Sequence, residues 1–475
     1  NNKNFNDTTK YKKGICMIKP LCYSLITLLT PISAIAQTMA IKTTDELVST
    51  DSEILFAYNK ESKQLEAINL LTSLSSELAL PKNAIGFDVA TLANITDKQA
   101  LVLTSDGVYK AQAGKPTLLF NYESVLNQLK IDKFEKVDFV FDANNDGLSD
   151  IFIPGLASST LYIQNKDGSF KPNKFKQTPM YEGSFSGKGL SLEVNINNKP
   201  VVIDFNHDGL SDLVFSNDFG ADVLLANSEG FEQKLTSIDF NIELGELSNG
   251  ETRKIKQIID INNDGFLDFT TRQFKPTQGM DSLDIKIAHT LYLGSAKGFS
   301  NTPITLFETQ GPSELLLKTD FNNDGLIDLQ KMDLDIGLGT IASMALGGGS
   351  TDVDVEMNIY KQQPDGSFAN KSSIELDLEM EVGMNGDDSE PALYLGDING
   401  DSYIDAVYKY SKKTLYIYYG EQDSLLNDKR KKLKLTLPKN NKDILLVDIN
   451  QDGKKDFVFK FTEEDGTSKI ETRLN

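Results

Sequence analysis

The nine residues DFNHDGLSD at 204–212 matter most for the fold, because their pattern occurs six times along the chain. Aspartate occupies positions 1, 5 and 9 of every copy, asparagine occupies position 3, and glycine occupies position 6 except at Ser402. The copies are DANNDGLSD at 142–150, DFNHDGLSD at 204–212, DINNDGFLD at 260–268, DFNNDGLID at 320–328, DINGDSYID at 397–405 and DINQDGKKD at 448–456. Six copies in one register form an internal repeat, so a repeat architecture is considered before any other fold.

Each copy lies between two short apolar segments that are typical of β-strands. VDFVF precedes Asp142 and IFI follows Asp150, while ILLV precedes Asp448 and FVF follows Asp456. Runs of β-branched and aromatic residues of this length favour strands. Further along, an apolar strand, a polar turn with glycine and an aromatic residue indicate a hairpin, as in LYIQNKDGSF from Leu161. One unit therefore predicts four antiparallel strands, with the nine-residue loop between the first two.

The spacing of the loops predicts a β-propeller. Successive loops begin 51 to 77 residues apart, which is typical of four-stranded propeller blades. A degenerate copy, LANITDKQA at 92–100, begins 50 residues before Asp142, keeps only Asn94 of the pattern and precedes the strand-like LVL. We interpret it as a blade without metal, the alternative being an unrelated connector. The predicted fold is an all-β, seven-bladed β-propeller of four-stranded antiparallel blades.

The two ends of the chain are expected to share the last blade. After the last loop only about two strand-like segments remain, DFVFKF and SKIETRL, so that blade is incomplete. Two N-terminal segments, ILFAY at 54–58 and QLEAINL at 64–70, have no place in the other blades. We expect these N-terminal strands to complete the last blade, which closes the ring and leaves no open sheet edge.

The chemistry of the loop indicates calcium. Calcium takes six to eight oxygen ligands, and the loop offers side-chain oxygens at positions 1, 3, 5 and 9 and a backbone carbonyl at position 7. Glycine at position 6 permits the sharp turn that such a loop needs. About six Ca²⁺ sites are predicted. Their ligands are Asp142, Asn144, Asp146, Leu148, Asp150, Asp204, Asn206, Asp208, Leu210, Asp212, Asp260, Asn262, Asp264, Phe266, Asp268, Asp320, Asn322, Asp324, Leu326, Asp328, Asp397, Asn399, Asp401, Tyr403, Asp405, Asp448, Asn450, Asp452, Lys454 and Asp456.

Three other interpretations of the loop were weighed. An EF-hand opens in the same way, but it needs a glutamate at position 12 and flanking helices. Position 12 is never acidic in this chain, being Ile153, Phe215, Thr271, Lys331, Tyr408 and Phe459. Plain Asp/Asn/Gly turns would not explain six copies that share four acceptor positions. Magnesium is less favoured because it demands strict octahedral geometry and keeps its waters.

The N-terminus has the pattern of a signal peptide. Lysines at 12, 13 and 19 precede an apolar run at 21–32, and Ser33-Ala34-Ile35-Ala36 offers a small-x-small cleavage site. We expect a signal peptide over 1–36, export to the periplasm or the extracellular space, and a single propeller domain over 37–475. Residues 1–16 precede the first methionine and are open to interpretation as an over-long gene call. The alternative is an uncleaved anchor, although the run is shorter than the ~20 residues that a span needs.

Both cysteines, Cys16 and Cys22, lie in this leader. The mature chain is therefore expected to contain no disulfide, no thiolate metal site and no cysteine nucleophile. His207 and His289 are its two histidines, and no G-x-S-x-G or H-E-x-x-H motif is present. The sequence thus offers no recognisable catalytic constellation, and we expect that the protein is not an enzyme.

Composition limits the class of partner. Hydrophobic residues make up 39% of the chain and charged residues 25%, which is typical of a globular protein. The net charge of -21 argues against nucleic acid, because phosphate binding needs a basic surface. No later stretch is long and apolar enough for a transmembrane segment, and we expect a monomer.

With these loops and strands the chain resembles the FG-GAP/VCBS repeat family, whose repeats build the integrin α-subunit propeller and many bacterial exported proteins. The resemblance runs from about Phe87 to the C-terminus and is most specific at the six loops. It implies a seven-bladed propeller with calcium in the loop between the first two strands of a blade, on the ligand positions given above. The copy at 92–100 departs from the pattern, so no metal is implied there, and Ser402 replaces the usual glycine in one loop.

Two functions remain open. The first is a protein-binding or adhesion scaffold with an unknown protein or glycan ligand, and the alternative is a carbohydrate-binding or carbohydrate-cleaving propeller. Sugar faces usually stack on aromatic rings; the chain has no tryptophan but retains 16 tyrosines and 26 phenylalanines. The sequence also contains an apolar, glycine-rich insertion, GLGTIASMALGGGST at 337–351. We expect it to pack on one propeller face or to contact a partner, the alternative being a passive connection between strands.

Overall fold

A computed structural model describes most of the chain from residue 36 onward. The described residues are 36–41, 46–59, 62–123, 134–155, 158–177, 181–186, 189–194, 199–278, 281, 284–311, 313–335, 350–383, 392–463 and 467–475. The chain divides into two units, Asn1–Ser33 and Ala34–Asn475, and only the second is described below. The predicted signal peptide therefore lies outside the described residues, except for Ala36.

The unit Ala34–Asn475 consists of β-sheets, and eight of them are blades, four-stranded or extended by one short strand. Blade I contains β2 (Glu46–Ser49), β3 (Ile54–Asn59), β4 (Gln64–Asn69) and β5 (Leu74–Leu78). Blade II contains β6 (Ala84–Ala90), β7 (Gln99–Thr104), β8 (Gly107–Lys110) and β9 (Thr117–Asn121), with the short β10 (Glu135–Lys136) parallel to β6. Blade III contains β11 (Val140–Phe141), β12 (Asp150–Ile153), β13 (Ser159–Gln164) and β14 (Phe170–Phe175). Blade IV contains β17 (Val201–Ile203), β18 (Asp212–Asn217), β19 (Gly220–Leu224) and β22 (Thr236–Ser237).

The other four blades repeat this order. Blade V contains β24 (Thr252–Ile259), β25 (Asp268–Phe274), β26 (Lys286–Tyr292) and β27 (Ile304–Gln310), with the short β23 (Gly245–Glu246) beside β24. Blade VI contains β28 (Ser313–Thr319), β29 (Asp328–Asp335), β30 (Ser350–Tyr360) and β31 (Ile374–Gly383). Blade VII contains β32 (Leu393–Gly396), β33 (Asp405–Ser411), β34 (Thr414–Tyr418) and β37 (Lys431–Lys434). Blade VIII contains β38 (Ile444–Val447), β39 (Asp456–Thr462), β40 (Ser468–Arg473) and β1 (Ala36–Ile41).

Smaller elements lie between the blades. Two-stranded hairpins are formed by β15 (Tyr181–Ser186) with β16 (Gly189–Val194), β20 (Ala226–Asn227) with β21 (Gly230–Phe231), and β35 (Gly420–Glu421) with β36 (Leu425–Leu426). The 3₁₀ helix η3 (Asn441–Asp443) precedes β38. No helix in the described part of the chain has the length and apolar character that a membrane crossing needs.

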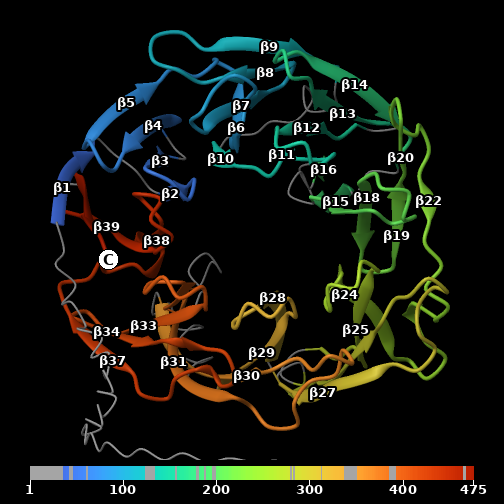
Figure 1. Ribbon diagram of the computed structural model, residues 1–475. Helices are drawn as coiled ribbons and strands as arrows, with labels where there is room; N and C mark the ends of the chain where they lie inside the picture. The colour runs from blue at the N-terminus through green and yellow to red at the C-terminus, as the bar shows by residue number, and fades with distance from the viewer. Residues whose placement is uncertain are drawn as a thin grey trace, which may run out of the picture. The chain divides into compact units, whose positions relative to one another are not determined.

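The blades follow one another around a ring, with the first strand of a blade toward the centre and the last at the rim (Figure 1). Eight clusters of buried apolar side chains lie between neighbouring blades, one cluster for each pair. Leu55 and Ile68 of blade I, for example, pack against Val447 and Val458 of blade VIII. Burial of apolar surface between blades therefore stabilises a closed ring, because each sheet buries both of its faces.

The predicted number of seven blades is wrong, because blade I was not recognised. The segments at 54–58 and 64–70, expected to complete the last blade, form β3 and β4 of a blade of their own. Its first two strands are joined by the short stretch 50–53 instead of a nine-residue loop, and its outer strand β5 is mostly exposed and polar. Neither feature carries the repeat pattern that identifies the other blades.

Closure by the N-terminus occurs, but through a strand that the sequence did not reveal. Strand β1 pairs antiparallel with β40, from Ala36 opposite Arg473 to Ile41 opposite Ser468. Met39 and Ile41 bury their side chains in the cluster between blades VIII and I. Three strands from the C-terminal end and one from the N-terminal end thus make up blade VIII.

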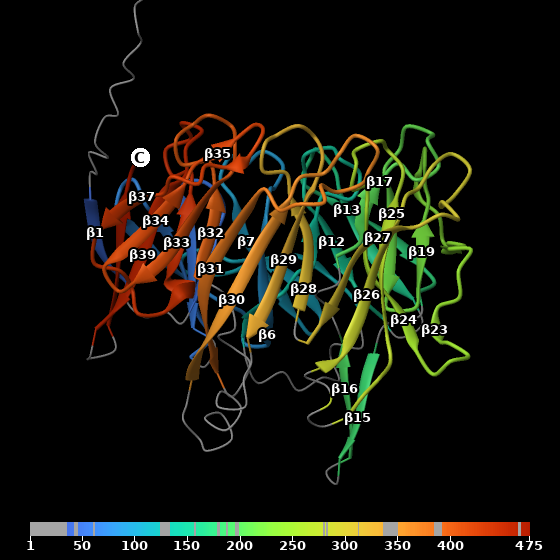
Figure 2. The same ribbon diagram turned by 90° about the horizontal axis from the view of Figure 1, so that it is seen from below.

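The longest excursions lie opposite the nine-residue loops. Figure 2 shows hairpin β15–β16 and the far end of β30–β31 on one side of the blades, and hairpin β35–β36 on the other. The insertion at 337–351 joins β29 to β30; residues 337–349 lie outside the described residues, and Ser350 and Thr351 begin β30.

The closure of the ring can be tested with two aspartate substitutions in β1. Ile41→Asp would place a charge at a side chain that is 3% exposed, in the cluster that joins blades VIII and I. We expect it to lower the free energy of unfolding by more than about 3 kcal/mol. Thr38→Asp, at an exposed position of the same strand, should stay within about 0.5 kcal/mol of the parent. Urea denaturation measures both, and equal stability of the two variants would show that β1 does not close the ring.

Candidate metal loops

The six nine-residue loops occupy equivalent places in six consecutive blades. Each joins the first strand to the second in blades III to VIII, and position 9 is the first residue of the second strand. Because the chain runs the same way through each blade, all six loops lie at the same end of the sheets.

The loops share one backbone conformation. Positions 4 and 6 both have positive φ in every copy, as His207 (59°) and Gly209 (88°) do in blade IV. In the fifth copy the glycine has moved: Gly400 occupies position 4 (82°), and Ser402 takes the positive φ at position 6 (71°). A non-glycine residue at positive φ is uncommon, so surrounding contacts must hold this turn in place.

The side chains at positions 1, 3 and 5 meet around the backbone amide of position 5. In blade IV, Asp204 accepts hydrogen bonds from the amides of Asp208 (3.0 Å) and Gly209 (2.9 Å). Asn206 accepts from the amide of Asp208 and donates its own amide nitrogen to the Asp208 carboxylate, both at 3.0 Å. Asp208 in turn accepts from the amide of Leu210 at position 7 (2.9 Å). Two carboxylates and one amide oxygen are thus held side by side at the surface.

The loop of blade VI differs at position 3. Asn322 is 2% exposed, and its Oδ1 is buried without a hydrogen-bond partner, whereas its Nδ2 donates to Asp324 (2.9 Å) and to the carbonyl of Gln422 (2.8 Å). Gln422 belongs to the β35–β36 hairpin of blade VII, which lies close to this loop. A buried acceptor atom without a hydrogen-bond donor lowers the stability of the fold unless another group, such as a cation or a water, binds it.

The aspartate at position 9 has a different role from those at positions 1 and 5. Asp268 accepts from the amide of Ile261 at position 2 of its own loop (2.9 Å) and from the amide of Gly294, just after the third strand (2.7 Å). The same two kinds of bond recur in the other five blades. All six carboxylates are at most 1% exposed, so each ties its loop to the body of the blade from beneath.

Burial makes the position-9 carboxyl groups weaker acids than an aspartate in water. Desolvation is the main cause, and it raises the pKa of Asp150 to about 7 and the pKa of Asp268, Asp328, Asp405 and Asp456 to about 6. The backbone amides that they accept from oppose this rise, while the aspartates at positions 1 and 5 add to it in these five loops. A cation in the loop would oppose it as well, because it favours the charged form.

The loops of blades V to VIII are bonded to one another. The amide at position 8 of one loop donates to a carbonyl at the start of the preceding loop, as Ile327 does to Ile261 (3.1 Å) and Ile404 does to Phe321 (2.8 Å). The amide of Lys455 bonds in the same way to Asp397 (2.6 Å). These four loops therefore form a connected row along one end of the ring.

The degenerate copy at 92–100 is held by a side chain of the next blade. It lies between β6 and β7 of blade II, and Gln164 of blade III accepts from the amide of Ala93 (2.7 Å). The amide nitrogen of Gln164 donates to the carbonyls of Thr91 and Ser149, so the buried glutamine bridges the two blades.

The residues present fit a hard cation such as calcium. Positions 1, 3 and 5 bring carboxylate and amide oxygens close together, and Asn322 adds a buried oxygen that has no hydrogen-bond partner among the described residues. No three His, Cys, Asp or Glu side chains are gathered as a metal site within the described ranges. This is understandable, because the structure brings the predicted ligands at positions 1, 3 and 5 together, whereas both oxygens at position 9 accept from backbone amides. Whether the loops bind calcium stays a prediction.

Both histidines contact neighbouring side chains. His289 is 6% exposed and bonds to Thr309 (3.2 Å), and burial lowers its pKa to about 4. The ring of His207 lies against that of Phe266 of the next loop, with centroids 4.3 Å apart.

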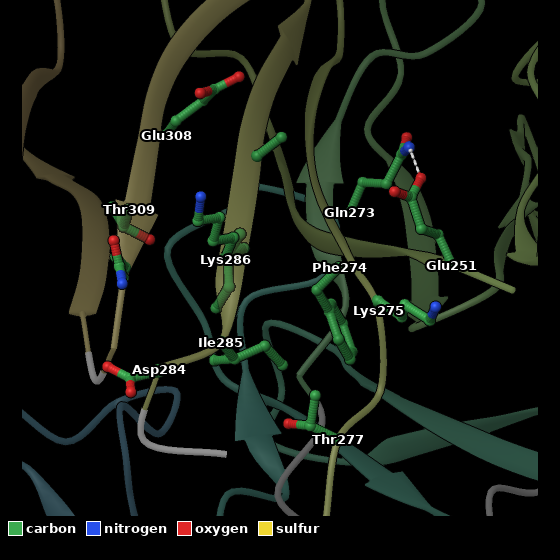
Figure 3. A pocket seen from close by; sticks show the side chains of 13 residues that line it. Glu251, Gln273, Phe274, Lys275, Thr277, Asp284, Ile285, Lys286, Glu308 and Thr309 are labelled. Atoms are coloured by element: carbon green, nitrogen blue, oxygen red, sulfur yellow. Dashed lines mark hydrogen bonds between the residues drawn. The ribbon is translucent and has the colours of Figure 1, made fainter. Parts of the chain in front are cut away.

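A groove of about 560 Å³ lies at the end of blade V opposite the loops (Figure 3). Its walls include Lys275, Asp284, Lys286 and Glu308, and Gln273 donates to Glu251 (2.5 Å) on one side. Sequence patterns gave no sign of this groove, since its residues come from strand ends that carry no motif.

The separate role of position 9 can be tested in metal-free protein. Asp268→Ala would leave the amides of Ile261 and Gly294 without their acceptor, at a cost of about 1–3 kcal/mol each. Asp264→Ala, at the exposed position 5 of the same loop, should cost under about 1 kcal/mol in chelator. Urea denaturation in excess chelator compares the two, and an equal loss of stability would rule out the distinct role of Asp268.

One repeat family matches a part of this chain. An FG-GAP-like repeat is matched at residues 142–215, and no curated protein matches the chain. Among solved structures, a putative 6-phosphogluconolactonase from Bacteroides fragilis aligns at 13% identity over 84% of this chain and 96% of its own, with a TM-score of 0.30. A Lactobacillus plantarum protein aligns at 10% identity over 85% and 98% (TM-score 0.33), and the V. cholerae biofilm matrix protein Bap1 at 9% over 92% and 76% (TM-score 0.27).

At these TM-scores the solved structures support no inference about the activity of this chain. The repeat match covers two of the six loops, 142–150 and 204–212, and it extends to the second strand of blade IV. Together with the propeller arrangement of the blades, it supports an FG-GAP/VCBS-like β-propeller.

Proposed function

We propose that this protein is an exported, calcium-binding β-propeller that serves as a scaffold for binding another protein. The propeller with its FG-GAP-like repeat is consistent with a protein-binding scaffold. The observation that carries the calcium proposal is Asn322, whose buried Oδ1 has no partner at a predicted ligand position of one of six alike loops.

In each loop the side chains at positions 1, 3 and 5 would hold the ion, with positions 7 and 9 as the further predicted ligands. A bound cation would supply positive charge where aspartates otherwise face one another. The chain's own residues prepare this site: the amides of positions 5, 6 and 7 orient the carboxylates, and position 9 fixes the loop on the blade.

Calcium would then act on the connected loops together. The loops of blades V to VIII share backbone hydrogen bonds, so fixing one of these four loops restricts the next. An ion that binds only the folded state stabilises it by RT ln(1 + [L]/Kd), or about 2.7 kcal/mol per site at a hundredfold excess over Kd. Several such sites would add up to the ~5–15 kcal/mol that a typical domain possesses.

Export is supported by the pattern of the leader. The predicted cleavage point after Ala36 falls at the first residue of β1, so removal of the leader would leave Met39 and Ile41 in place to close the ring. A scaffold without catalysis is supported by the environment of the histidines, since His289 is buried and bonded to Thr309.

Removal of calcium tests this function. We expect a chelator to lower the melting temperature of the purified protein steeply, because the ions stabilise only the folded state. Excess calcium should restore the melting temperature, and the same ionic strength of sodium chloride should not. Differential scanning fluorimetry measures the three conditions. A melting temperature that is the same with and without chelator would contradict the proposal.

A further inference from the structure

Blade VII carries a strongly basic surface on an acidic protein. Between residues 409 and 442 the chain has ten lysines and arginines but three aspartates and glutamates, although its net charge is -21. We use the name cationic strip for the exposed cations at the outer strands of this blade. They are Lys412, Lys413, Lys429, Arg430, Lys432 and Lys434.

The cationic strip has no acidic partner among the described residues. None of its six cations forms an ion pair in the part of the chain that the structure describes. Lysines elsewhere do find acids, as Lys254 does with Asp218 (2.7 Å) and Lys256 does with Glu314 (2.9 Å). Like charges held this close repel one another, so the strip costs stability that no ion pair among the described residues offsets.

Aromatic rings lie among these cations. The guanidinium of Arg430 lies 3.9 Å from the centroid of Tyr416, and the Lys432 ammonium lies 5.8 Å from the same ring. Tyr410 is 54% exposed, and its ring centroid is 5.0 Å from that of Tyr416. The surface thus combines a fixed guanidinium with an open, flat apolar ring.

Sheet register places Tyr416, Lys432 and Lys434 side by side. Tyr416 of β34 pairs with Lys432 of β37 on one side and with Tyr408 of β33 on the other, and Thr414 pairs with Lys434. Strand β37 is the outermost strand of blade VII and lies at the rim of the ring (Figure 1). The strip is therefore an open, elongated surface.

Protection of a sheet edge does not explain the strip. Lysines on an outer strand do discourage pairing with other chains. However, the outer strands β5, β9, β22, β27 and β31 contain no lysine at all. Edge protection also needs no arginine stacked on tyrosine and no exposed ring beside it.

We propose that the cationic strip binds an acidic polysaccharide, a linear chain of sugars that bears carboxylate or sulfate groups. Arg430 and the lysines match such anions, since guanidinium groups pair with carboxylates and sulfates through two parallel hydrogen bonds. The Tyr410 ring would stack on the apolar face of a sugar. The open shape suits a chain, and it does not enclose a small molecule.

The negative charge of the rest of the protein favours a polyanion of low charge density over a nucleic acid. Duplex DNA carries one charge per about 1.7 Å and would extend from the strip onto acidic surface, where it is repelled. A polysaccharide with one charge per sugar or two is repelled less.

This inference is independent of the calcium proposal, because blade VII binds through β34 and β37 and not through its loop.

Binding of defined probes tests the inference. We expect polygalacturonate and heparin, but not neutral dextran, to bind the full chain in isothermal titration calorimetry at low ionic strength, and to bind less as salt increases. Lys432→Glu/Lys434→Glu should weaken binding by at least about tenfold. Tyr410→Ala should weaken it by about tenfold at unchanged charge, as expected for loss of a stacking contact.

A matched control changes the same charge on another outer strand. Lys171→Glu/Lys174→Glu in β14 of blade III should leave binding within about twofold of the parent, and melting temperatures confirm that every variant is folded. Three results would overturn the inference. These are no binding of either acidic probe, equal losses in the two charge variants, or binding of polyglutamate or a single-stranded oligonucleotide as tight as that of polygalacturonate.

Discussion

The buried aspartate at position 9 accepts hydrogen bonds from two backbone amides at once, one in its own loop and one beyond the third strand. It thereby joins the start of its loop, the second strand and the chain after the third strand. Its cost is the burial of a carboxylate, which shows as a raised pKa in all six loops. The loop above it, with positions 4 and 6 in the left-handed region, is held in one conformation because its second residue is anchored there.

The ring is built on this local unit by packing between blades. Each of the eight apolar clusters belongs to two neighbouring blades, so no blade has a hydrophobic core of its own. Blade VIII completes the circle by taking its outer strand from the N-terminal end. Loop-to-loop hydrogen bonds add a second, polar connection along one end, while the excursions β15–β16 and β30–β31 extend from the other (Figure 2).

The sequence predicted those parts of the structure that leave a repeated chemical pattern. Six loops in one register gave the blade type, the place of the loop and the family. The sequence does not predict blade I, because the stretch 50–53 between its first two strands lacks the repeat pattern. It does not predict β1 either, because the six residues AQTMAI are too few to show a strand periodicity. Position 9 stays a predicted ligand, and the structure adds that its oxygens accept from two backbone amides, a role that an invariant aspartate in the sequence does not reveal. The cationic strip depends on register between β34 and β37, which composition does not show.

The protein thus concentrates opposite charges in different places. Its loops carry 18 aspartates in a row along one end, and blade VII carries the cationic strip at the rim. The central claim is that the loops are calcium sites, and an anomalous difference map from a crystal grown with calcium tests it most directly. The account predicts six peaks, each among positions 1, 3 and 5 of one loop, and none in the loop at 92–100. Loops without anomalous density in the presence of millimolar calcium would contradict it.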